Sequence, residues 1–354
     1  MIDKLIIVGG FLGSGKTTLL AEAAKQLAKQ GKSVGLITND QAPELVDTRL
    51  LTGIGKGVSE VAGSCFCCNF NGFVNAVQSL IQQSAQIVIA EPVGSCTDLS
   101  ATIMNPLKKF QPNWNLAPLS VLVDPKRLPE IFGTVKSHVD PDALYIMELQ
   151  LAEADRIFVS KCDLLSEAEK KDALALLEQK YPGKKIGFLS SKIGEGFDDW
   201  LSEVQHASDA GTTIVPVDYD RYAHGEAVLG WLNATATISP NTDGKQLITD
   251  LLTAFHDEIK NLNTEVGHVK AVLAIDGNEW VGNLTSLKGN VDIRETEPKL
   301  GNAVLVLNAR VQMLPEALET LVRNLFGTFN LSLDSLRCLM PGRPNPTYRF
   351  LSHA

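Results

Sequence analysis

The segment that most constrains the fold is residues 10–17, which has the spacing G-x-x-x-x-G-K-T. It follows an apolar run at 5–8 and precedes a segment of helical periodicity at 17–30. A buried strand, a glycine-rich turn and a helix are therefore predicted in that order. The backbone N–H groups of such a turn, with the positive end of the helix, bind phosphate groups. The segment predicts a nucleotide-binding domain.

Each position of this segment has a chemical role. Glycines let the backbone turn around the phosphates, Lys16 reaches the terminal phosphates, and the Thr17 hydroxyl ligates Mg²⁺. The predicted phosphate-binding residues are Gly10, Gly13, Ser14, Gly15, Lys16, Thr17 and Thr18.

The first 207 residues alternate short β-branched runs with helical segments, which is typical of a mostly parallel sheet covered on both faces. We therefore predict an α/β P-loop NTPase domain over 1–207. The strand runs are 4–8, 33–38, 86–90, 119–123, 156–160 and 185–189, and helical patterns cover 16–30, 166–180 and 196–204.

A small, polar stretch at 205–216 predicts a linker, after which a second domain over 216–354 begins. Its pattern is strand, helix, two strands in a hairpin, strand, helix, and an ending strand or tail, which indicates a smaller α+β domain of ferredoxin-like type. The expected elements are 226–238, 245–262, 266–275, 279–284, 303–311 and 315–326.

The base is predicted from Ser160-Lys161-Cys162-Asp163, which follows an apolar strand and has the form of a guanine-reading motif. A carboxylate at Asp163 accepts from the guanine N1–H and amino group, a donor pair that adenine lacks. Ser191 and Lys192 follow the next strand, and we expect them to lie against the base on its other side. GTP is favoured, and a charged strand-to-helix turn is the alternative.

Hydrolysis requires a magnesium site and an ordered water. Glu91 ends the third predicted strand in Glu91-Pro92-Val93-Gly94, where a carboxylate binds Mg²⁺ through water or positions the attacking water. Asp47, in the loop after the second strand, is the other predicted acid. Solvated surface charges are the alternative for both residues.

Three cysteines crowd one short loop, Cys65, Cys67 and Cys68, whereas Cys96, Cys162 and Cys338 are scattered. Thiolates bind zinc and similar ions strongly, so the loop predicts a metal site that lacks one ligand. Asp40, Glu44, water or a partner are the candidates for that ligand. Since adjacent cysteines cannot both face one site from a strand, the loop must be irregular. A redox dithiol and simple packing are the alternatives.

Together these motifs resemble the CobW-like metallochaperone GTPases, which are related to the nickel-enzyme maturation GTPases. The resemblance rests on residues 9–20, the Cys-x-Cys-Cys loop at 63–68, Glu91-x-x-Gly94 and Ser160-Lys161-x-Asp163. It implies GTP-dependent metal binding or delivery, metal ligation by the three cysteines, and a variable C-terminal domain. The chain departs from the family at Asn39-Asp40-Gln41-Ala42-Pro43, where the usual motif is Asn-Glu-Phe-Gly-Glu.

Lys and Arg number 32 against 41 Asp and Glu, a net charge of -9, which argues against a nucleic-acid or anionic-membrane partner. The N-terminus has no basic leader, and no run of about 18 apolar residues exists. We therefore expect a soluble, cytoplasmic protein.

The sequence as a whole predicts a Mg²⁺-dependent GTPase whose nucleotide state controls a thiolate site for Zn²⁺ or Co²⁺. GTP and GDP, Mg²⁺ and the thiolate-bound ion are the expected cofactors. A metalloprotein or corrinoid-protein client is the expected partner, and dimerisation is implied by the resemblance alone. Two alternatives stay open: a P-loop ATPase or kinase with structural cysteines, and a non-catalytic module that senses nucleotide and metal.

Overall fold

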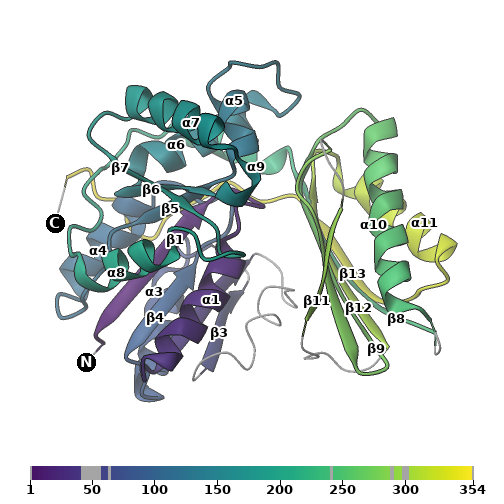
Figure 1. Cartoon of the computed structure of the whole chain (residues 1–354), viewed down its shortest axis with the longest axis horizontal. Coiled ribbons are helices and arrows are strands. Elements are labelled where there is room, and N and C mark those ends of the chain that lie inside the picture. Colours follow the sequence, from purple (N-terminus) through teal and green to yellow (C-terminus); the bar gives the residue numbers. More distant parts are fainter. Residues whose placement is uncertain are drawn as a thin grey trace.

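The chain folds into two layered α/β units, seen side by side in Figure 1 of the computed structural model. The structure describes residues 2–40, 57–62, 65–239, 242–287, 291–296 and 303–352. A seven-stranded sheet forms the core of the first unit, and a six-stranded sheet forms the second. The predicted fold class, a P-loop NTPase domain followed by a smaller α+β domain, is confirmed.

The first sheet is parallel at every strand pair, in the order β3-β2-β4-β1-β5-β6-β7. Alternate residues of β1 point to opposite faces, so Leu5 and Ile7 enter one apolar cluster and Ile6 and Val8 another. Both faces are buried, as a parallel sheet requires. The strands are β1 (Lys4–Gly10), β2 (Val34–Asp40), β3 (Gly57–Ala62), β4 (Ile87–Glu91), β5 (Ser120–Val123), β6 (Arg156–Ser160) and β7 (Lys185–Leu189).

Helices cover both faces of this sheet. α1 (Lys16–Lys29) and α8 (Phe197–His206) bury leucine and tryptophan side chains against the Ile6 face. The Leu5 face is covered by α3 (Phe70–Gln82), α4 (Asn105–Phe110), α6 (Pro141–Glu153) and α7 (Glu167–Lys180). The short helix α5 (Leu128–Ile131) precedes α6.

The second sheet is antiparallel, in the order β11-β10-β9-β12-β8-β13. Two helices, α10 (Gly244–Asn261) and α11 (Pro315–Thr328), pack on one face, and Figure 1 shows them on the side away from the first unit. Without the β10–β11 hairpin, the order β9-β12-β8-β13 is that of a ferredoxin-like layer. The strands are β8 (Gly230–Thr237), β9 (Val266–Ile275), β10 (Asn278–Leu284), β11 (Asp292–Thr296), β12 (Val304–Val311) and β13 (Ser332–Leu339).

One predicted strand begins too early. The expected strand at 226–238 starts at Gly230, because residues before it form the helix α9 (Tyr219–Ala227). The Asp218 side chain caps this helix by accepting from the N–H groups of Asp220 and Arg221. Tyr222 and Glu226, one turn apart, are buried. The strands β3 and β11 were also not predicted.

The segment after β13 crosses back to the first unit, and the C-terminus lies there in Figure 1. Phe350 N–H donates to the Ala101 carbonyl at 2.9 Å, and the Arg349 guanidinium donates to Asp98 at 2.6 Å. The Tyr348 ring packs on Phe70, with centroids 5.3 Å apart. We call residues 340–352 the C-terminal strap. Two chain crossings, at α9 and at the strap, therefore join the units.

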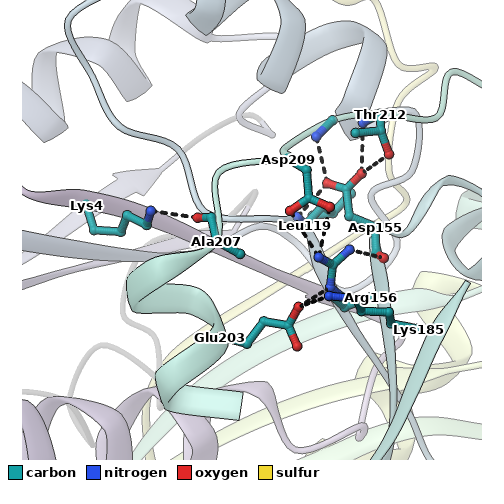
Figure 2. Close-up of polar contacts among 10 residues, drawn as sticks. Lys4, Leu119, Asp155, Arg156, Lys185, Glu203, Ala207, Asp209 and Thr212 are labelled. Atoms are coloured by element: carbon teal, nitrogen blue, oxygen red, sulfur yellow. Dashed lines mark hydrogen bonds and ion pairs between the residues drawn. The ribbon is translucent and has the colours of Figure 1, made fainter. Parts of the chain in front are cut away.

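The polar stretch after α8 is held against the first sheet, as Figure 2 shows. Asp155 accepts from the N–H groups of Leu119, Gly211 and Thr212 at 2.6–2.8 Å and from the Thr212 hydroxyl. Arg156 adds bonds to Glu203 and to both oxygens of Asp209. The predicted linker is therefore an ordered connection.

Among the described residues, no helix combines the length and apolar character that crossing a membrane requires.

The Asp155 contacts predict a large effect on stability. Asp155→Ala should lower the free energy of unfolding by about 3 kcal/mol, because the buried N–H groups of Leu119 and Gly211 and the N–H group of Thr212 lose a charged acceptor. Asp209→Ala, whose side chain is 56% exposed, should cost less than about 1 kcal/mol. Urea unfolding of both variants tests this, and equal small losses would contradict it.

Candidate functional site: a nucleotide cavity and a cysteine turn

The phosphate loop lies where β1 meets α1. Gly10, Gly13 and Gly15 have positive φ angles of 130°, 76° and 94°, which favour glycine. A Cβ on Gly10 would lie 2.3 Å from the Leu122 carbonyl oxygen, so β5 approaches the loop closely there. No side chain caps the start of α1. The turn therefore presents backbone N–H groups and a helix N-terminus to one side.

Three predicted residues meet beside this loop. The Thr17 hydroxyl donates to Glu91 Oε1 at 3.3 Å, and Lys16 Nζ lies 3.9 Å from the same oxygen. Lys16 also donates to the carbonyls of Gly10 and Phe11. All three side chains are buried, so the strand-end acid, the lysine and the hydroxyl share a site shielded from water.

This arrangement fits a phosphate group and its Mg²⁺. The Ser14 hydroxyl is buried and has no hydrogen-bond partner among the described residues, and a phosphate oxygen would accept from it. Thr17 and Glu91 offer the hydroxyl and carboxylate oxygens that Mg²⁺ prefers. A cavity of about 1310 Å³ opens over these groups.

The predicted base-binding residues line the same cavity, at the ends of β6 and β7. Lys161 has a left-handed backbone, with φ of 51°, and its ammonium group donates to Asp124 at 2.7 Å. The Ser160 hydroxyl donates to the Val123 carbonyl. The structure thus brings these residues to the phosphate loop: Ser160, Lys161, Asp163, Ser190, Ser191 and Lys192.

Three predicted acids fall wholly or partly outside the described residues. Asp47 lies outside the described residues, as does Glu44. Asp40 ends β2, but its side chain lies outside the described part of the structure.

The second sheet forms the other wall of the cavity. A Cβ on Gly13 would lie 2.9 Å from Thr285 Cγ2, and Arg127 donates to the carbonyls of Val266 and Thr285. The cavity is lined on this side by Trp231, His268, Lys270, Asn283, Thr285 and Arg310. Sequence reasoning missed this wall, because no local pattern indicates which domain surface faces a distant turn.

The cysteine loop is a turn that leads into α3. The N–H groups of Cys68 and Asn69 donate to the Cys65 carbonyl, and α3 starts at Phe70. The Sγ atom of Cys65 lies 2.9 Å from that of Cys67 and 3.0 Å from that of Cys68. The irregular backbone expected from adjacent cysteines is therefore present, and the three sulfurs converge.

The pKa values of the three thiols are shifted in different directions. Hydrogen bonds from Cys67, Cys68 and Cys96 hold the pKa of the Cys65 thiol well below its usual range. The hydrogen bond to Cys65 raises the pKa of Cys67, and the pKa of Cys68 rises to about 11 for the same reason. The cluster favours a thiolate at Cys65, the form that binds metals.

Asn39, near the end of β2, joins the cysteine turn to the nucleotide cavity. Its side-chain oxygen accepts from the Phe66 N–H at 2.9 Å, and its amide donates to the Val61 carbonyl. Asn39 also lines the cavity. One buried side chain therefore contacts both sites.

The C-terminal strap covers the cysteine turn. Asn345 N–H donates to Cys68 Sγ at 3.2 Å, and Thr347 N–H donates to the Cys67 carbonyl at 2.8 Å. The Thr347 hydroxyl donates to the Cys68 carbonyl at 3.1 Å. N–H donors to sulfur stabilise thiolates, so the strap supports the turn electrostatically as well as sterically. The sequence predicts an ending strand or tail in this region, but no local pattern indicates that the tail contacts the cysteine turn.

The strap contacts predict protection of Cys68. Tyr348→Ala removes the ring that packs on Phe70 and Phe110, and should increase alkylation of Cys68 by iodoacetamide several-fold, because the strap loosens. Leu351→Ala, at a side chain that is 80% exposed, is the matched control. Mass spectrometry of the Cys68 peptide measures the rate, and no increase over the control would contradict the prediction.

The chain is similar to known nucleotide-binding proteins. A model of the CobW/HypB/UreG nucleotide-binding domain matches residues 4–187. A search of curated proteins returned no match. Solved structures similar to this chain include Zn(II)-bound YjiA GTPase from E. coli, which is 15% identical, with 93% of this chain and 99% of that chain covered and a TM-score of 0.36.

Two hydrogenase maturation factors also show similarity. HypB from Archaeoglobus fulgidus is 18% identical, with 56% of this chain and 86% of that chain covered and a TM-score of 0.39. HypB from Helicobacter pylori, solved with nickel, is 18% identical, with 56% and 83% covered and a TM-score of 0.38. Since the family model spans more than half of the sequence, the chain belongs to the CobW/HypB/UreG family of nucleotide-binding proteins.

Proposed function

We propose that this protein is a Mg²⁺-dependent GTPase whose nucleotide state controls metal binding at Cys65, Cys67 and Cys68. The observation that carries the proposal is Asn39, which lines the nucleotide cavity and accepts from the backbone of the cysteine turn. A change in the cavity that moves the end of β2 therefore also moves the sulfur atoms.

The proposed chemistry is hydrolysis of the γ-phosphate. Lys16 neutralises charge on the terminal phosphates, Thr17 holds Mg²⁺, and Glu91 positions the attacking water or a water on the metal. The water oxygen bonds to the γ-phosphorus as the bond to the β–γ bridging oxygen breaks. Asp47 is retained as the proposed first-switch acid, on the resemblance alone.

The proposed cargo is a borderline or soft divalent ion such as Zn²⁺ or Co²⁺. Three sulfurs within 3.8 Å of one another favour such an ion over Mg²⁺ or Ca²⁺. Delivery to a metalloprotein or corrinoid-protein client, with recognition by residues 216–354, is part of the proposal. Dimerisation across the nucleotide is proposed on the resemblance alone, and a cytoplasmic location is retained from the sequence expectation.

Guanine recognition gives the next prediction. Asp163→Asn should weaken GTP binding at least ten-fold and improve binding of xanthosine triphosphate, because an amide donates where the carboxylate accepts. Asp172→Asn, at an exposed position of α7, is the control. Fluorescent-nucleotide competition measures both. Unchanged base preference would favour the ATPase or kinase alternative.

Coupling between the two sites gives another prediction. Metal affinity of the reduced protein should differ at least five-fold between GDP and a non-hydrolysable GTP analogue, since the cavity and the cysteine turn share Asn39. Competition with a chelator measures the affinity, and Asn39→Ala should reduce the difference. Equal affinities in the two states would refute the coupling.

Catalysis is tested separately from coupling. Phosphate release by the wild type and by Glu91→Ala, measured with Mg²⁺ and with added Zn²⁺ or Co²⁺, should show at least a ten-fold loss in the variant. If metal affinity depends on the bound nucleotide but no phosphate is released under any condition, the result would favour the non-catalytic module that senses nucleotide and metal.

A further inference from the structure

The second sheet has an inner face, the one opposite α10 and α11, which Figure 1 shows on the side of the first unit. Val269 and Ala271 of β9 point to the helices, so Lys270 between them points to the inner face. Asn283 of β10 and Asn308 of β12 pair directly with Lys270. A buried ammonium group between two amides therefore lies in the wall of the nucleotide cavity.

One end of this sheet packs on the phosphate loop. A Cβ on Gly267 would lie 3.2 Å from Leu12 Cδ1, and a Cβ on Gly13 would lie 2.9 Å from Thr285 Cγ2. The register of β9 against β12 skips Gly267, which indicates a β-bulge at the point of contact. Lys270 follows Gly267 by three residues, a distance of about 10 Å along a strand. The sheet therefore holds Lys270 at a short distance from the phosphate loop.

Three Lys or Arg side chains of the described second sheet line the cavity, namely Lys270, Arg294 and Arg310. Arg310 Nη1 donates to the Leu232 carbonyl and to Asn233 Oδ1, both at 3.0 Å, so this guanidinium braces its own sheet. Arg294 is exposed on the edge strand β11. Lys270 lies in β9, inside the sheet, and is 6% exposed. Lys270 is therefore the cation of this wall that is both shielded from water and placed near the loop.

We propose that Lys270 contacts the terminal phosphate of the bound nucleotide, so that the second unit supplies a positive charge to the nucleotide site of the same chain. This inference rests on the proposed function and deepens it. The sheet approaches the phosphate loop at Leu12 and Gly13, next to β4 and its Glu91, whereas the predicted base-binding residues lie at the ends of β6 and β7. A cation from the same chain is one way to stabilise the charge of a phosphoryl-transfer transition state.

This contact distinguishes the two nucleotide states. GTP carries the γ-phosphate and GDP lacks it, so the attraction exists in the GTP state alone, and burial limits its screening by water. The C-terminal strap continues from β13 of the same sheet, and its Asn345 N–H donates to Cys68 Sγ. A shift of the sheet between the two states would therefore also act on the cysteine turn.

The test is nucleotide binding by the full-length protein with Mg²⁺, measured by fluorescent-nucleotide competition for a non-hydrolysable GTP analogue and for GDP. Lys270→Gln removes the charge and keeps a polar side chain, and Lys270→Arg keeps the charge. Arg337→Ala is the matched control, because Arg337 pairs with Asn233 on the same face of the sheet but is exposed in β13.

Lys270→Gln should weaken binding of the GTP analogue about ten-fold or more, the effect typical of one charge-assisted hydrogen bond, and should change GDP binding less than about two-fold. Lys270→Arg should restore most of the affinity for the analogue, and Arg337→Ala should behave as the wild type. An unchanged affinity for the analogue, or equal losses for the two nucleotides, would overturn the inference.

A second measurement needs no substitution. Acetylation of Lys270 in the wild type, followed by mass spectrometry, should be several-fold slower with the GTP analogue than with GDP, and equal rates would also overturn the inference. Neither measurement involves hydrolysis or the thiols. An unchanged preference in Lys270→Gln therefore counts against this inference alone, whereas failure of the wild type to bind either nucleotide would overturn the proposed function with it.

Discussion

The close packing of the loop after β4 on the phosphate loop is the constraint on which the rest of the site depends. Gly94 has no room for a side chain beside Leu12, so the two loops are in backbone contact. Glu91 at the start of this loop accepts from the Thr17 hydroxyl at 3.3 Å, so the end of β4 also contacts the start of α1.

The second unit contributes residues to both the nucleotide cavity and the surroundings of the cysteine turn. Its sheet carries Lys270 and Arg310, both buried, into the wall of the nucleotide cavity, where they add positive charge opposite the phosphate loop. Its C-terminal strap crosses to the cysteine turn and donates to Cys68. The C-terminal domain thus contributes to the nucleotide cavity and to the cysteine turn.

The phosphate loop and six of the seven strands of the first sheet were predictable because their signals are local. Gly10, Gly13 and Gly15 adopt the positive φ angles that the turn requires. Short runs of β-branched and other apolar residues form the buried strands of the first sheet. Asp163 and Ser191 reach the phosphate loop because the carboxyl ends of parallel strands share one edge. The helix α9 was missed because Tyr222 and Glu226 are buried against Thr97 and Ser95, which lie 125 and 131 residues away in the sequence.

The sequence by itself determined the nucleotide cradle and the presence of three closely spaced thiols, since each depends on residues within about ten positions of one another. Only the tertiary structure decided that Asn39 and the strap residue Asn345 contact the cysteine turn, and that Lys270 and Arg310 line the nucleotide cavity. The reason is physical: these contacts join segments up to 277 residues apart. Their positions are set by packing of the two sheets, which no local periodicity encodes.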